Sequence, residues 1–298
     1  MNTDIKKIQE QLGIPITGIL DDFTQAAWKN YCIKNGLKYS VLVGESEDEE
    51  DEHDQTLGFI STDLSEFKPQ IKSFLLSPTQ YFKGPTKKES IFIHFTAGWD
   101  NPYSVINDWN KDSRGQVGTQ FVIGGQNAQT LEDKYDGEIV QCFPNYGCYG
   151  WHLGIGNTSV HRNSIGVEVC NIGPLSKAGN DYLMWANKKV NPEIIIDLKQ
   201  EYRGYKYFQK ITDNQLHALN FLLTKVANDN GIDITKGLKE RIKKLGKWKA
   251  FDFDQDIKDG KVKGLFCHAN VSGKNRYGGY EKWDWPPMDN LCDLILSF

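Results

Sequence analysis

The chain has 298 residues, of which 39% are hydrophobic and 25% are charged, a composition typical of a globular protein with one large domain or a domain and a small module. No stretch of about 18 apolar residues occurs, which excludes a membrane-spanning helix, and no basic run indicates nucleic-acid binding. The formal net charge of -4 is uneven, because eight of the 39 acidic residues lie between Glu45 and Asp54 and leave the rest of the chain mildly basic.

The first 43 residues are predicted to form a small helical module. Ile5, Ile8 and Leu12 follow the spacing of one helix face. Thr24 is a suitable N-cap for a second helix. Two short helices are therefore expected before the chain changes composition.

An acidic linker is predicted for residues 44–56, GESEDEEDEHDQT. So few apolar side chains cannot offset the entropy of ordering this segment. His53 within it is expected to be solvated rather than a ligand. The main domain is predicted to follow, over residues 57–298.

This domain is predicted to be α/β, with a central mixed β-sheet flanked by helices on both faces. Short apolar segments predict its strands and amphipathic segments predict its helices. The predicted strands are residues 91–95, 119–123, 138–143 and 164–169, and the predicted helices are residues 101–109 and 212–230. Strands that alternate with helices are typical of a partly parallel sheet that is covered on both sides.

Two histidines each follow a short apolar segment and precede a polar loop that contains glycine: His94 in IFIHFTAGW and His268 in LFCHANVSG. Taken alone, His94 is more simply interpreted as a core or capping histidine. Asp284 in EKWDWPP would complete a set of two histidines and one carboxylate, which leaves a fourth zinc position open. The interval between the two histidines is far too long for a local motif, so spacing alone does not establish this set.

Glu168 lies within a predicted apolar strand, on the face opposite Val167 and Val169. It is either a salt-bridged strand residue or a general base close to zinc. Lys282, two residues from Asp284, is either a surface lysine or a group that stabilises an oxyanion.

Six cysteines are present, and none belongs to a CxxC zinc pattern. Cys142 and Cys148 are close enough in sequence to pair. The opening sequence MNTDIKKIQEQLG has neither the apolar core nor the cleavage site of a Sec signal peptide, so synthesis in the cytoplasm is expected. Buried thiols are therefore predicted in preference to disulfides.

Six segments in the same order resemble the type-2 N-acetylmuramoyl-L-alanine amidases, a family that includes phage amidase lysozymes and animal peptidoglycan recognition proteins. The segments are IFIHFTAGW, VGTQFVIGG, GEIVQCFPNYGCYGWHLGIG, NSIGVEVCNIG, TDNQLHALNFLL, and LFCHANVSGK through KWDWPP. Each motif is weak alone, but together they are specific, and they cover about residues 85–290 with insertions.

The resemblance implies Zn2+ as the cofactor, with His94, His268 and Asp284 as its ligands. It also implies Glu168 as the catalytic carboxylate and Lys282 as the oxyanion partner. The reaction that follows is hydrolysis of the amide bond between N-acetylmuramic acid and L-alanine in peptidoglycan. A domain that only binds peptidoglycan and a cytosolic amidase that recycles muropeptides are the alternatives.

Trp151 and His152 match the Trp-His turn that borders the active site in this family, so a substrate-binding or supporting role is implied for both. Thr96, in the segment of the first ligand, is expected to bind substrate with them. His161 and His217 match no motif and are expected to lie on the surface.

Two features depart from the family pattern. The interval from His268 to Asp284 is longer than usual, through NRYGGY, and Cys267 is the other candidate ligand nearby. Residues 172–210 form a long insert, which either lines the substrate groove or is a plain structural hairpin or helix. Its candidate groove residues are Trp185, Tyr202, Arg203, Tyr205 and Tyr207.

The N-terminal segment IQEQLGIPITGILDDFTQAAWKNY resembles the start of a peptidoglycan-binding module, in a shortened form. A wall-binding segment beside a wall-cutting domain makes each interpretation support the other. Without a Sec signal, the combination favours a phage endolysin or a wall-lytic effector, which would act at the cell wall after release or delivery.

Overall fold

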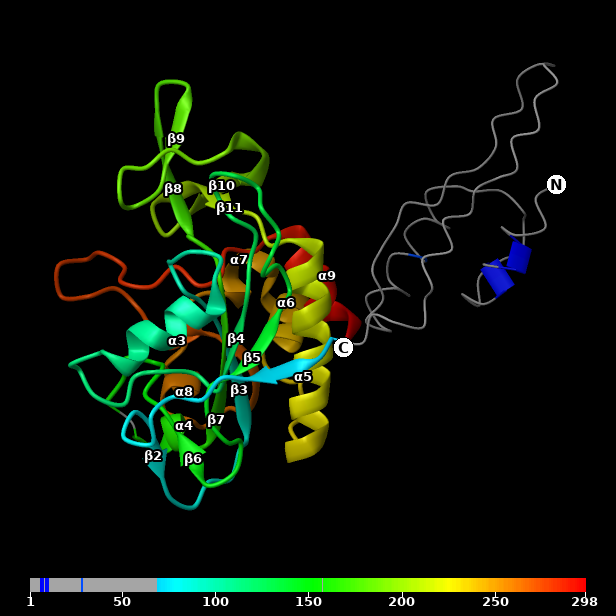
Figure 1. The fold of residues 1–298 in the computed structure, drawn as a ribbon. Coiled ribbons are helices and arrows are strands. Elements are labelled where there is room, and N and C mark those ends of the chain that lie inside the picture. Colours follow the sequence, from blue (N-terminus) through cyan, green and yellow to red (C-terminus); the bar gives the residue numbers. More distant parts are fainter. Residues whose placement is uncertain (1–5, 8, 11–27, 29–68, 157) are drawn as a thin grey trace. The chain divides into compact units, whose positions relative to one another are not determined.

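A six-stranded mixed sheet lies at the centre of the computed structural model, which describes residues 6, 7, 9, 10, 28, 69–156 and 158–298 (Figure 1). β4, β7, β3 and β12 run parallel, and β5 pairs antiparallel with β4. The strands, in the order in which neighbours pair, are β1 (Ile71–Ser73), β5 (Ile139–Gln141), β4 (Phe121–Ile123), β7 (Ser164–Val169), β3 (Ser90–Phe95) and β12 (Gly264–Cys267). The carboxyl ends of the parallel strands therefore meet at one edge of the sheet, which is where ligands bind in open α/β sheets.

The central strands consist of apolar residues because both of their faces are covered. All six residues of β3 and all four of β12 are buried. Strands buried on both sides read as continuous apolar runs rather than as an alternation. The four strands predicted from the sequence are confirmed as β3, β4, β5 and β7.

Helices cover both faces of this sheet, as predicted. Figure 1 shows α5, α6 and α9 on one face and α3, α4 and α8 on the other. The helices are α3 (Pro102–Asn110), α4 (Thr158–Arg162), α5 (Asp213–Asn230), α6 (Leu238–Leu245), α7 (Lys247–Ala250), α8 (Gln255–Lys258) and α9 (Asp289–Ser297), with 3-10 turns η1 (Pro192–Ile194) and η2 (His268–Asn270). The domain therefore has the predicted α/β fold.

The long helix α5 begins and ends where its sequence predicts. Thr212 accepts a hydrogen bond from the backbone N–H of Gln215, whose side chain accepts one from the N–H of Thr212, which is a complete capping box. Gly231 ends the helix with a left-handed φ of 65°. The apolar face of the helix is buried in the core, at Leu216, Leu219, Leu223 and Val226.

The insert of residues 172–210 folds into a second, four-stranded sheet that projects from one end of the domain (Figure 1). Its strands, in pairing order, are β10 (Ile195–Tyr202), β11 (Tyr205–Gln209), β8 (Pro174–Ala178) and β9 (Asp181–Leu183). Tyr202 and Arg203 at the turn between β10 and β11 are buried, so they do not line an open groove. Trp185 is 65% exposed and donates a hydrogen bond to the carbonyl of Ala97. A two-stranded sheet of β2 (Phe82–Lys83) and β6 (Cys148–Tyr149) is the third sheet among the described residues.

The predicted N-terminal module and acidic linker lie outside the described residues, apart from five positions with helical backbone: Lys6, Lys7, Gln9, Glu10 and Trp28. Residues from Pro69 to Phe298 form one compact unit. Within the part of the chain that the structure describes, no helix combines the length and the apolar character needed to cross a membrane.

Two expectations about single residues have clear outcomes. The thiols of Cys142 and Cys148 are buried and free, as predicted. The expectation that His161 and His217 lie on the surface is wrong, because their exposed fractions are 2% and 1%. His217 belongs to the buried face of α5, and His161 lies in the last turn of the short helix α4.

Candidate metal centre

His94 and His268 are neighbours because they lie at the carboxyl ends of paired strands. β12 pairs with β3 so that Cys267 is in register with Ile93, and the next residues along are His268 and His94. Residues in register on parallel strands point to the same face of the sheet. Asp284 joins them from the loop that follows η2, and the candidate ligand atoms of the three residues all lie within 4.8 Å of one another.

The long interval before Asp284 does not prevent this meeting. Asp284 Oδ1 accepts a hydrogen bond of 2.7 Å from the backbone N–H of Phe95, and its carbonyl accepts one from Ala269 N–H at 2.9 Å. These bonds fix the aspartate against both β3 and η2. Asp284 Oδ2 is left facing the histidines, 4.0 Å from His268 Nδ1.

The hydrogen bonds of His152 and Ser164 determine which nitrogen of His94 carries the proton. Ser164 Oγ donates to the carbonyl of Val160 at 2.7 Å, so it accepts the bond of 2.9 Å from His152 Nε2. His152 Nδ1 then carries no proton and accepts the bond of 3.0 Å from His94 Nε2. The remaining nitrogen of His94, Nδ1, is therefore an unprotonated acceptor that faces the site.

The same reasoning applies to His268. Its Nε2 lies 2.9 Å from the carbonyl of Leu153, which can only accept, so Nε2 carries the proton. His268 Nδ1 is consequently unprotonated, and it lies 2.9 Å from His94 Nδ1. Two lone pairs at this distance repel unless a cation lies between them. Two neutral imidazoles beside a carboxylate are the donor set of a catalytic zinc site, so the residues fit this metal.

Burial keeps these rings neutral. The pKa of His268 is lowered to about 3, first by burial and then by the charge of Lys282. Burial and the neighbouring imidazoles lower the pKa of His94 and of His152 well below its usual range. Burial raises the pKa of Asp284. Neutral rings keep their unprotonated nitrogens available as ligands of a divalent cation.

Glu168 stands beside His94 on the neighbouring strand. The two residues are in register on β7 and β3, so their side chains leave the sheet on the same face, at a strand spacing of roughly 4.8 Å. The pKa of Glu168 is raised to about 8, first by burial and then by the nearby Asp284, while Lys282 opposes the rise. A carboxyl group whose pKa lies near neutrality suits proton transfer.

An open cleft of about 650 Å³ is lined by His268, one of the three candidate ligands. Lys282 and Trp151 are exposed side chains on its wall, and His152 and His268 also line it. Trp151 packs against Phe82, with ring centroids 5.2 Å apart. Four of the eight residues chosen from the sequence thus line this cleft, and two more, His94 and Asp284, contact a residue that does.

Thr96 is placed differently from the other residues expected at the substrate. Its hydroxyl donates to the carbonyl of Asn171 at 3.3 Å and accepts from the N–H groups of Gly98 and Asn171. These bonds connect the loops that follow β3 and β7. In the structure, Thr96 therefore connects the carboxyl ends of β3 and β7, beside the site.

His161 belongs to no sequence motif, but this residue supports the Trp-His turn. His161 Nδ1 accepts from the backbone N–H of His152 at 3.2 Å, and its Nε2 donates to the carbonyl of Ile155 at 3.0 Å. His161 therefore holds the backbone of the turn, while the side chain of His152 contacts His94. The only available signal was its position seven residues before Glu168, on the short segment that leads into that strand.

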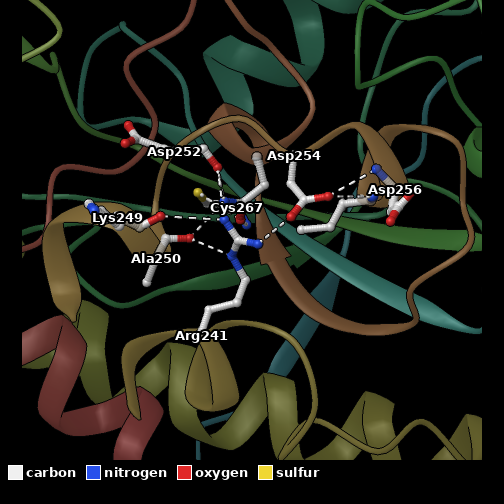
Figure 2. A network of polar contacts seen from close by, with 9 residues as sticks. Arg241, Lys249, Ala250, Asp252, Asp254, Asp256 and Cys267 are labelled. Carbon is white, nitrogen blue, oxygen red and sulfur yellow. Dashed lines mark hydrogen bonds and ion pairs between the residues drawn. The ribbon is translucent and has the colours of Figure 1, made fainter. Parts of the chain in front are cut away.

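A second polar network fixes the far side of η2 (Figure 2). Arg241 donates from Nε to the carbonyl of Ala250 at 2.9 Å and pairs with Asp254 at 2.5 Å. Asn270 donates to the same carbonyl of Ala250 and accepts from Cys267 N–H at 3.0 Å. The thiol of Cys267 also points to Asn270 Oδ1, at 3.3 Å. Cys267 is thus committed to this network and is not part of the ligand group.

No protein-family model and no curated protein sequence matches the chain. Among solved structures, one described as "Structure of PlyL" is similar over 69% of this chain and 84% of that one, with 16% identity and a TM-score of 0.36. A "Mutant endolysin from Bacillus subtilis" is similar over 35% of this chain and 62% of that one, with 25% identity and a TM-score of 0.27. At these TM-scores the likeness assigns no activity, so function has to be argued from the side chains of the cleft.

Proposed function

We propose that this protein is a zinc-dependent amidase that hydrolyses the amide bond between N-acetylmuramic acid and L-alanine in peptidoglycan. The motifs of residues 85–290 support the choice of reaction and substrate. Delivery to the wall as an endolysin or as a wall-lytic effector belongs to the same proposal. Peptidoglycan is then the partner of the cleft.

One observation carries the proposal: the unprotonated Nδ1 atoms of His94 and His268 face each other at 2.9 Å beside the carboxylate of Asp284. These three residues would hold the ion. Bound there, zinc would act as a Lewis acid that polarises the scissile carbonyl and makes water easier to deprotonate. Three protein ligands leave room for substrate or water, as expected of a catalytic rather than a structural site.

Glu168 is assigned the proton transfers. Its carboxylate takes a proton from the attacking water while the water oxygen bonds to the amide carbon. When the carbon–nitrogen bond breaks, Glu168 returns that proton to the leaving amine of L-alanine. A single carboxyl group can act first as base and then as acid because burial raises its pKa towards neutrality.

Lys282 is assigned the role of stabilising the negative charge that develops on the amide oxygen. It lies on the cleft wall together with His268, and its exposed ammonium is free to approach substrate. A positive charge at this place favours the tetrahedral transition state over the neutral amide. Trp151 on the same wall offers an apolar surface to the glycan or to the peptide.

The test combines metal analysis with digestion of purified sacculi. One zinc per chain and newly freed amino groups of L-alanine, without new reducing sugar ends, are expected. A chain that binds sacculi but contains no zinc and releases nothing would instead be a recognition domain. Activity on soluble muropeptides but not on sacculi would identify a recycling amidase.

A further inference from the structure

Arg203 lies at the tip of the inserted hairpin, in the turn between β10 and β11. Its backbone has a left-handed φ of 51°, and its side chain is 8% exposed. A left-handed conformation is unfavourable for a residue with a side chain, so surrounding contacts must hold it there. The hydrogen bonds of its side chain all reach one other part of the chain, residues 269–282.

The guanidinium group of Arg203 binds both ends of the loop that joins two candidate ligands. Its Nη2 donates to the carbonyl of Ala269 at 2.8 Å, one residue after His268. Its Nη1 donates to the carbonyl of Lys282 at 2.6 Å, two residues before Asp284, and to that of Ser272 at 2.8 Å.

Two further contacts tie the same loop to the hairpin tip. The carbonyl of Arg203 accepts a hydrogen bond from Trp283 Nε1 at 3.1 Å. The ring of Tyr280 lies 4.7 Å from the guanidinium carbon. The bond from Asn275 N–H to the carbonyl of Gly279, by contrast, lies within the loop itself.

We propose that Arg203 is a positioning residue that sets the place of Asp284 and Lys282 relative to His268. This inference rests on the proposed metal site. The bonds from Phe95 and Ala269 hold Asp284 itself, and Arg203 adds a clamp on both ends of the loop that leads to it. The inserted hairpin therefore supports the long loop between His268 and Asp284, because Arg203 at its tip binds both ends of that loop.

The chemistry of arginine explains why this residue and not lysine stands at the tip. The planar guanidinium group presents several N–H donors in a fixed fork, which suits three carbonyl groups that approach from different directions. A lysine ammonium keeps the positive charge but is a compact point donor without this fixed geometry. Arg203→Lys should therefore retain the charge and lose the clamp.

The experiment compares Arg203→Lys and Arg203→Met with wild type in the full chain. Zinc affinity is measured by competition with a chelator, and the visible spectrum of the cobalt-loaded protein reports the geometry around the metal. Both variants should bind zinc about 10- to 100-fold more weakly, as is usual when a group that orients a ligand is lost. Their cobalt spectra should differ from the wild-type spectrum.

Tyr202→Phe is the matched control. Tyr202 is the neighbouring buried residue on the same hairpin tip, but its hydroxyl donates to the carbonyl of Phe251 and not to the ligand loop. This variant removes one buried hydrogen bond and should keep the wild-type zinc affinity and cobalt spectrum.

The outcomes separate this inference from the proposed function. A wild-type protein that does not bind zinc would overturn both the proposed function and the positioning role. Wild type that binds zinc, together with folded Arg203 variants of unchanged affinity and spectrum, would overturn the positioning role alone. If Arg203→Met does not fold by circular dichroism, Arg203→Lys decides; loss of the fold in both variants would contradict a role limited to the ligand loop.

Discussion

His94 Nε2 and His152 Nδ1 lie 3.0 Å apart, and the hydrogen bond between them determines which nitrogen of His94 faces the candidate metal site. His152 can accept this bond because its other nitrogen donates to Ser164 Oγ. The chain of bonds thus runs from the backbone of Val160 to a candidate ligand atom. Partners of this kind fix the tautomer and the orientation of metal-binding histidines.

Replacing His152 with Phe keeps an aromatic ring and removes both nitrogen atoms. His94 then loses the acceptor that holds the proton on Nε2, so we expect zinc affinity to fall about 10- to 100-fold. Titration with a chelator of known affinity measures this change. Ser164→Ala, one bond further from the metal, should give a smaller loss; equal affinities for all three proteins would show that the chain of bonds has no influence on the metal.

Glu168→Gln separates metal binding from catalysis. Glu168 is not among the gathered ligand residues, so zinc content should stay at the wild-type level. Loss of the proton carrier should lower turnover about 100- to 10,000-fold. Release of L-alanine amino groups from sacculi, measured beside zinc content, checks both statements. Near-normal turnover by this variant would remove Glu168 from the mechanism.

Local sequence patterns were sufficient for the elements that carry the site. β3 and β7 are apolar runs, and α5 begins at a capping box and ends at a glycine, all of which depend on residues close together in the chain. The order of the strands in the sheet then brings His94 and Glu168 into register. The resemblance of the motifs to a known family suggested that His94 and His268 belong to one site, because their distance in the sequence is too long for a local motif.

The supporting groups could not be predicted because their partners are distant in sequence and are backbone carbonyls. Arg203 contacts segments that begin 66 residues further on. A carbonyl is present at every residue, so nothing in the sequence marks which ones a buried arginine will reach. The same holds for His161, whose partners are the backbone groups of His152 and Ile155.

The Trp-His turn depends on close backbone contact at Gly150. A Cβ atom at this position would lie 2.4 Å from the carbonyl oxygen of Gly118, which cannot rotate away as a flexible side chain can. Gly150→Ala should therefore shift the turn and lower the free energy of unfolding by about 1–3 kcal/mol. Urea unfolding measures this loss.

Gly156→Ala provides the comparison within the same loop. A Cβ atom there meets nothing within 4 Å, and the φ of Gly156 is not in the left-handed region. Its unfolding free energy should stay within about 0.5 kcal/mol of wild type. Equal stability of the two variants would mean that the backbone at Gly150 adjusts without loss.

Asp136 gives the domain a pH dependence that is independent of the cleft. Burial raises the pKa of its carboxyl group from the usual 3.8 to about 6, although hydrogen bonds from Thr212 and Asn214 oppose this shift. Between about pH 4 and pH 6 the folded state therefore holds a proton that the unfolded state has released. The state that holds more protons is favoured at lower pH, so the stability contributed by Asp136 is present below about pH 4 and is lost as the pH rises through 6.

Asp136→Asn removes this titration. The variant cannot ionise, so its unfolding free energy minus that of wild type should increase from pH 4 to pH 6 and become constant above about pH 7, with a slope of at most about 1.4 kcal/mol per pH unit. Any change in the hydrogen bonds to Thr212 and Asn214 adds a constant offset and leaves this slope unaffected. Urea unfolding of both proteins at intervals of half a pH unit gives the two curves. Parallel curves across this window would show that Asp136 ionises in the folded protein as it does in the unfolded chain.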